Sequence, residues 1–95
     1  MKRNNDYLYY ILSAVAENYG DPLRFTALFQ AWVNSESPNE KESKDFVLAN
    51  RLLMEEGFTL ATTVTRSGEE VPHTIDRLTW KGFDLLEQLK VKSKS

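Results

Sequence analysis

Residues 57–77 read GFTLATTVTRSGEEVPHTIDR, and this stretch decides the fold because its apolar residues follow a different period from those before it. Through residues 58–65, Phe, Leu, Thr and Val alternate with Thr and Ala, which is the pattern of a half-buried strand. Residues 66–69 have the composition of a turn, with a glycine where positive φ is favourable. Residues 71–77 predict a returning strand, with Pro72 at an edge or unpaired position. The stretch therefore predicts a β-hairpin, which must pack on helices because an isolated hairpin is only marginally stable.

Two amphipathic helices are predicted before this hairpin, near the start of the chain. Over residues 5–19, apolar side chains recur at i, i+3, i+4, i+7 and i+11, and Gly20 is placed to end the helix. Asp21 and Pro22 then predict the N-cap and the first residue of a second helix. This helix runs to about Val33, and its apolar residues again follow helical spacing.

A third helix is predicted to follow the second and to run to about Glu56. Ser37 is placed to cap this helix, Pro38 suits its first position, and Glu40 can complete a capping box. After the hairpin, Thr79 can cap a last helix whose apolar residues lie in one stripe.

The order helix, helix, helix, strand, strand, helix is that of a winged helix-turn-helix domain, which is mainly α with a two-stranded β wing (α+β). No repeat, linker or low-complexity tract divides the chain, so residues 1–90 are expected to form one domain, followed by a polar tail at 91–95. The two periods predict a core made of Leu8, Ile11, Leu12, Val15, Leu28, Phe29, Phe46, Leu53, Phe58, Ile75, Phe83 and Leu86.

The composition limits the classes of function. The 95 residues include no cysteine, which excludes disulfides, thiolate metal sites and cysteine nucleophiles and favours a reducing cytoplasm. No apolar run resembles a signal peptide or reaches the ~20 residues of a membrane span. The formal net charge is −2, whereas dedicated nucleic-acid binders are usually strongly basic.

No set of residues has the spacing of a catalytic or metal site. His73 is the single histidine, and without a second His or a Cys it is expected on the hairpin surface. The carboxylates fall in polar runs typical of solvated faces, and the glycines are too far apart to form a phosphate-binding loop. We therefore expect a protein that is not an enzyme and that needs no metal or cofactor.

Binding to DNA is the common function of the winged-helix fold, and its contacts are predicted on the third helix and the wing. In a helix-turn-helix pair the second helix enters the major groove, and the third helix takes that position here. Lys41, Lys44 and Arg66 are the candidate contacts, two on this helix and one in the wing turn. Acidic residues outnumber basic ones in both elements, and phosphate contacts need Lys or Arg. At most weak DNA binding is therefore expected.

Tyr7, Tyr9 and Tyr10 are unusual because the apolar stripe of the first helix is already filled. Successive residues of a helix are turned by about 100°, so three tyrosines within four positions cannot all face the core, and at least one should be exposed. Because exposed aromatics are enriched at interfaces, the three are candidates for self-association as a twofold dimer. The alternative is that Tyr7 lies at the edge of the core with the tip of its phenol in water, and that the rings of Tyr9 and Tyr10 cover Lys or Arg stems or pack beneath the last helix. Trp80 is expected to pack between the wing and the last helix.

Met1-Lys2-Arg3, LLMEEG at residues 52–57 and RLTWKG at residues 77–82 together resemble a small bacterial and prophage winged-helix family to which no activity is assigned. The junction at 77–82 also resembles the one found in many winged-helix transcription regulators. The chain departs from the family pattern at Phe83, where the family commonly has His. It departs again at positions 9 and 10, where tyrosines stand in place of charged residues.

Two functions remain open from the sequence. The first is a regulatory protein of bacterial or prophage origin that binds DNA, as a dimer, in the manner of winged-helix transcription regulators. The second is a protein–protein interaction module of the same fold that does not bind DNA. The charge balance favours the second function, whereas the resemblance and the usual role of the fold favour the first.

Overall fold

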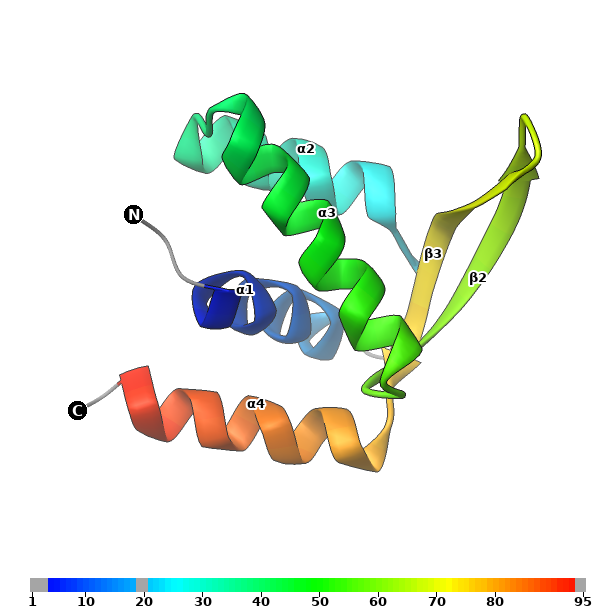
Figure 1. The fold of residues 1–95 in the computed structure, drawn as a ribbon. Coiled ribbons are helices and arrows are strands. Elements are labelled where there is room, and N and C mark those ends of the chain that lie inside the picture. The colour runs from blue at the N-terminus through cyan, green and yellow to red at the C-terminus, as the bar shows by residue number, and fades with distance from the viewer. Residues whose placement is uncertain (1–3, 19–20, 94–95) are drawn as a thin grey trace.

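The computed structural model describes residues 4–18 and 21–93 and has a mixed α+β architecture, with four helices and a three-stranded antiparallel sheet (Figure 1). The elements in chain order are α1 (Asn4–Glu17), β1 (Leu23–Arg24), α2 (Phe25–Glu36), α3 (Glu40–Glu55), β2 (Thr59–Arg66), β3 (Glu69–Leu78) and α4 (Trp80–Ser93). The α+β class predicted from the sequence is confirmed. The predicted end of the first helix at Tyr19 and Gly20 lies outside the described residues.

Helix α1 occupies the centre of the molecule. It contacts α3, α4 and β3, and Figure 1 shows α1 between α4 on one side and α3 on the other. The hairpin of β2 and β3 extends away from the helices. Ile11 and Leu12 of α1 are accordingly completely buried, as are Phe46 of α3 and Ile75 of β3.

The sheet has one strand more than the sequence predicts. In β1, Leu23 pairs with Ile75 and Arg24 pairs with Thr74, so the strand order is β1-β3-β2. The predicted two-stranded sheet and the predicted order of elements were therefore wrong at this point. A strand of two residues is too short to show a period, and the preceding Asp-Pro was interpreted as a helix start. The backbone instead stays extended through Arg24, and α2 begins at Phe25.

The hairpin closes through the tight turn that the sequence predicts. Arg66 and Glu69 are paired, and Ser67 and Gly68 between them have φ values of 52° and 81°. Two positive φ angles in a two-residue loop give a turn of type I′, whose twist matches that of the strands. Pro72 pairs with Thr63 of β2 beside the register shift between Thr62 and Thr63, and it lies beyond the residues of β3 that pair with β1. Irregular pairing of this kind is where a strand tolerates proline.

The third helix starts two residues later than predicted. Asn39 is the N-cap: its side chain accepts a 2.8 Å bond from the backbone N–H of Glu42, and its own N–H donates to the Glu42 carboxylate at 3.2 Å. The predicted box of Ser37 and Glu40 was wrong, because Ser37 has φ 48° and ends α2 by donating its N–H to the carbonyl of Val33. Ser37 and Glu40 have the same i, i+3 spacing as the pair that forms the box, so the motif was present in two registers.

The last helix is capped as predicted but is longer. Thr79 Oγ1 accepts a 3.1 Å bond from the backbone N–H of Gly82, which is the N-cap geometry. The helix continues to Ser93 and thus includes residues 91–93, which the sequence assigned to the polar tail.

The core is built around aromatic side chains from three helices. Trp32 and Phe46 stack with ring centroids 4.2 Å apart, and Tyr7 meets Trp32 edge-on at 5.6 Å. Of the predicted core, Leu8, Phe29, Phe58 and Phe83 are half-buried against it, and the rest are buried. The buried hydrophobic residues outside that prediction are Tyr7, Phe25, Trp32, Ala49, Leu78 and Leu89, and the polar residues Asn50 and Thr59 are buried as well.

Candidate interaction surface

Helix α3 presents one continuous exposed face, here called the α3 stripe. Its members are Lys41, Lys44, Leu48, Arg51 and Glu55. Their spacing of i, i+3, i+7, i+10 and i+14 places them along one side of the helix. The Lys44 ammonium lies 3.4 Å from the Glu40 carboxylate in an exposed pair, a kind of pair that contributes little to stability. Three members of the stripe are basic and one is acidic, so the stripe is more basic than the helix as a whole.

The two DNA-contact candidates on α3 lie on this stripe, and the third does not. Lys41 and Lys44 are one turn apart on α3, whereas Arg66 is exposed at the end of the hairpin that extends away from the helices (Figure 1). Arg51 was missed as a candidate. Its position seven residues after Lys44 and ten after Lys41 is the signal that groups it with them.

An acidic depression, here called the α3–hairpin trough, separates the α3 stripe from the hairpin. It has a volume of about 440 Å³ and is lined by Arg51, Met54, Glu55, Thr63, Glu69, Glu70 and Pro72. Three carboxylates thus border the trough against one guanidinium. A phosphate group placed between α3 and the hairpin would meet an excess of like charge.

A second depression, here called the α1–α3 groove, lies along another side of α3. It has a volume of about 150 Å³ and is lined by Leu8, Asp45, Leu48, Ala49, Leu52, Leu53, Glu56 and Phe58. Leu48 is 52% exposed and Leu52 is 42% exposed, so the groove continues into an apolar patch on the surface. The sequence left both leucines out of the predicted core but did not identify the groove, because helical spacing alone does not show where two helices leave space between them.

Lys81, near the start of α4, contacts two residues at one end of the α1–α3 groove. The Lys81 ammonium donates a 2.9 Å hydrogen bond to the backbone carbonyl of Glu56 and lies 4.6 Å from the centroid of the Phe58 ring. This is cation–π geometry. Trp80 next to Lys81 is 88% exposed, so its predicted packing between the hairpin and α4 was wrong. Thr79 makes that junction instead, because its hydroxyl donates to the carbonyl of Gly57 at 2.6 Å.

Tyr7 belongs to the core and is not available for a contact with a second copy. Its side chain is 1% exposed and contacts Trp32 and Phe46 edge-on. Burial raises the pKa of the Tyr7 phenol, and the nearby carboxylates of Glu42, Asp45 and Asp6 raise it further. Because it is buried, Tyr7 is removed from the residues proposed to mediate self-association.

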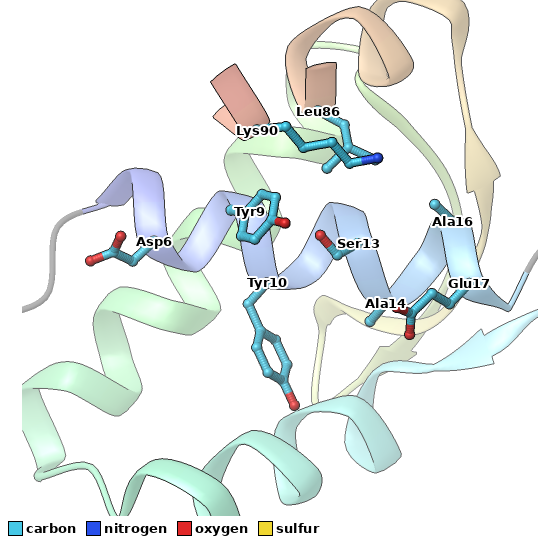
Figure 2. A pocket seen from close by; sticks show the side chains of 9 residues that line it. All are labelled: Asp6, Tyr9, Tyr10, Ser13, Ala14, Ala16, Glu17, Leu86 and Lys90. Atoms are coloured by element: carbon cyan, nitrogen blue, oxygen red, sulfur yellow. The ribbon is translucent and has the colours of Figure 1, made fainter. Parts of the chain in front are cut away.

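Tyr9 and Tyr10 are half-buried, so the expectation that at least one of the three tyrosines is exposed was wrong. Both line a depression of about 720 Å³ between α1 and α4 (Figure 2). Lys90 reaches over this depression from α4, whereas Tyr10 points away from α4 and meets Phe46 edge-on at 6.0 Å. The reason is that helices cover α1 on more than one side, so several of its faces are partly buried.

His73 is exposed on β3, at the hairpin surface where the sequence placed it. Within residues 4–18 and 21–93, no three His, Cys, Asp or Glu side chains are grouped so that they could hold a metal ion. No helix in the same part of the chain combines the length and apolar character needed to cross a membrane.

Comparison with known proteins finds no matching family model, no matching curated protein and no matching solved structure. The function is therefore argued from the geometry of the α3 stripe, the α3–hairpin trough and the α1–α3 groove.

Proposed function

We propose that this chain is a regulatory domain of winged-helix type that binds another protein through α3 and the surfaces beside it. The order of elements supports this proposal, with α3 as the second helix of the helix-turn-helix pair and the β2–β3 hairpin as the wing. The additional strand β1 pairs with β3 and leaves the hairpin free to extend as a wing. The proposed function includes no catalysis.

The observation that carries the proposal is the exposure of Leu48 and Leu52 on α3, beside the α1–α3 groove. An apolar patch with polar residues around it is typical of a protein-binding surface, because its burial against a partner removes apolar area from water. A helix that reads DNA needs polar or charged side chains at its exposed centre. Here Leu48 occupies the middle of the α3 stripe.

The charges beside α3 point in the same direction. Phosphate contacts supply most of the affinity of nonspecific DNA binding. The α3–hairpin trough places Glu55, Glu69 and Glu70 where a winged helix would approach the DNA backbone. These carboxylates favour a protein partner over a nucleic acid.

DNA binding remains the second candidate, and one observation favours it. Lys41, Lys44 and Arg51 share the α3 stripe with a single carboxylate, Glu55, so this face is more basic than the sequence of the helix suggests. A regulator that docks α3 into the major groove would use these three side chains, with Arg66 at the tip of the wing.

Selection of peptides from a displayed random library tests the protein-binding proposal. The native chain is expected to enrich peptides, and a Leu48→Asp, Leu52→Asp variant is expected to lose them because a charge replaces each exposed leucine. Leu60→Asp is the matched control, since Leu60 on β2 has the same 42% exposure as Leu52 but lies outside the groove. Circular dichroism and thermal unfolding verify that each variant is folded.

Fluorescence anisotropy with a labelled random-sequence duplex at low salt tests the second candidate. When the salt is raised to the physiological range, we expect a dissociation constant no tighter than ~10⁻⁶ M, the tight end of ordinary nonspecific binding. Tighter binding, with a salt slope that falls by ~1 for each of Lys41→Ala, Lys44→Ala and Arg51→Ala, would establish phosphate contacts by the α3 stripe. That result, together with no enriched peptide, would replace the proposed function by DNA binding.

A further inference from the structure

We infer that the α1–α3 groove binds an apolar side chain from a protein segment that carries Lys or Arg on both sides of that side chain. The inference rests on the proposed function and specifies the chemistry of the partner. Its support comes from the size of the groove and from the charges at its ends.

The size of the groove fits a side chain and not a free small molecule. Sites for small molecules usually have volumes of about 300–1,000 Å³, whereas the groove has about 150 Å³. Its walls are the aliphatic side chains of Leu8 and Leu53 and the ring of Phe58, with Leu48 and Leu52 at the opening. An aliphatic or aromatic side chain entering the groove would continue the contacts of the core.

The ends of the groove carry negative charge. Asp45 of α3 and Glu56, which is the C-cap residue of α3, both line the groove and lie eleven positions apart, which corresponds to about 16 Å along the helix. Across residues 4–18 and 21–93, neither carboxylate has an ion-pair partner. Lys81 stands beside the second end but binds the backbone carbonyl of Glu56, so the Glu56 carboxylate stays open to solvent.

These positions predict the spacing of the partner's charges. Two cations that reach Asp45 and Glu56 would be about five residues apart in an extended segment and about eleven apart in a helix. The apolar side chain that fills the groove would lie between them. Complementary charge at the two ends would fix the register of the segment and select against acidic segments.

The experiment selects displayed peptides of about 12 residues, long enough for either spacing. It uses the native chain and an Asp45→Lys, Glu56→Lys variant. We expect the native chain to enrich peptides with an apolar residue between two Lys or Arg residues. A peptide enriched on the native chain is then synthesised, and the variant should bind it at least tenfold more weakly in a fluorescence titration. Selection on the variant should instead enrich peptides with Asp or Glu. Glu69→Lys, Glu70→Lys is the matched control, because it makes the same change of charge outside the groove.

A second variant keeps the test valid if the reversal of charge disturbs folding. Asp45→Asn with Glu56→Gln removes both charges while it keeps the shape of the side chains, and it should also weaken the native peptide. Enriched peptides with no preference for basic residues, or with binding unchanged in both groove variants, would overturn the inference and leave the protein-binding proposal intact. If no library peptide is enriched on the native chain, both proposals are overturned.

Discussion

The phenol of Tyr7 shows at the scale of one residue what burial does to a side chain with a titratable group. Its ring packs edge-on against the stacked rings of Trp32 and Phe46, so burial favours the neutral form and the pKa is raised above its ordinary value of 10.0. The unfolded chain ionises this group at lower pH than the folded protein does. The contribution of Tyr7 to stability is thus fully present below about pH 10 and is lost as the pH rises through the folded-state pKa.

Tyr7→Phe should therefore reduce the loss of stability in alkaline solution. The difference in unfolding free energy between the native chain and the variant is expected to be constant near neutral pH. Above about pH 10 it should shift in favour of the variant, because phenylalanine has no proton to lose. Urea unfolding at a series of pH values measures this. Parallel stability curves through the alkaline range would mean that the Tyr7 phenol ionises equally easily in both states.

Gly82 is a glycine required by close approach of the backbone. A Cβ atom at this position would overlap the carbonyl oxygen of Phe58 and press against the side chain of Leu78. Gly82→Ala should therefore lower the free energy of unfolding by about 1–3 kcal/mol, although alanine favours a helix interior over glycine by about 1 kcal/mol. The exposed Gln88→Ala in the same helix is the control and should change stability by no more than about 0.5 kcal/mol. A stabilised Gly82→Ala would show that the contact with Phe58 relaxes without cost.

The burial of two aromatic side chains, Trp80 and Tyr7, differs from what the sequence predicted. Because Trp80 is aromatic, the sequence predicted that it would be buried. It is the first residue of α4, however, and its side chain is exposed to solvent. Tyr7 was grouped with the candidates for self-association, or placed at the edge of the core with its tip in water, yet the whole side chain lies inside the core. Helical spacing gives the angle between residues on one helix, but it does not show how many neighbours cover that helix.

At the scale of elements, α3 has a core face and an exposed face, and two consecutive residues lie on opposite sides of the boundary between them. Leu53 is 1% exposed, whereas the adjacent Leu52 is 42% exposed beside the α1–α3 groove. Leu53→Ala is expected to lower the free energy of unfolding by ~2–5 kcal/mol, because it leaves a cavity in the core. Leu52→Ala should cost less than about 1 kcal/mol. Chemical denaturation of both variants measures the difference, and equal losses would mean that the groove is closed in the folded chain.

The elements that the sequence predicted well are those with several periods or a defined turn chemistry. The hairpin had a period of two and a glycine turn, and the cap of α4 had Thr79 at the right distance from its apolar stripe. Strand β1 and the start of α3 were missed for opposite reasons. The two residues of β1 carry too little pattern, whereas the start of α3 carried two overlapping capping motifs.

At the scale of the whole molecule, a twofold dimer through α1 stays a prediction, now restricted to the parts of Tyr9 and Tyr10 that border the depression between α1 and α4. Sedimentation of the native chain at high micromolar concentration is expected to give the mass of a dimer. Tyr9→Lys should return the mass of a monomer, because it adds a charge beside Lys90. Leu60→Lys on the hairpin serves as the control. A native chain that remains monomeric would rule out this contact.

The surface chemistry of the molecule could be predicted only in part. The sequence identified Lys41 and Lys44, but it gave only the net charge of each element. In the structure, the charges of α3 are arranged as a basic stripe with acidic residues beside it. The α1–α3 groove depends on how α1 and α3 cross, which no local pattern specifies.

The junction at Thr79 has a consequence for how the chain folds. The backbone N–H of Thr79 donates to Phe58, its hydroxyl donates to Gly57, and the same hydroxyl caps α4. The bonds to Gly57 and Phe58 join residues more than twenty positions apart, whereas the cap joins Thr79 to Gly82, so this one residue connects the first turn of α4 to the start of the hairpin. The amide protons of β3 and of the first turns of α4 should therefore exchange with solvent in a single cooperative opening, with the hairpin and the helix acting as one unit of folding.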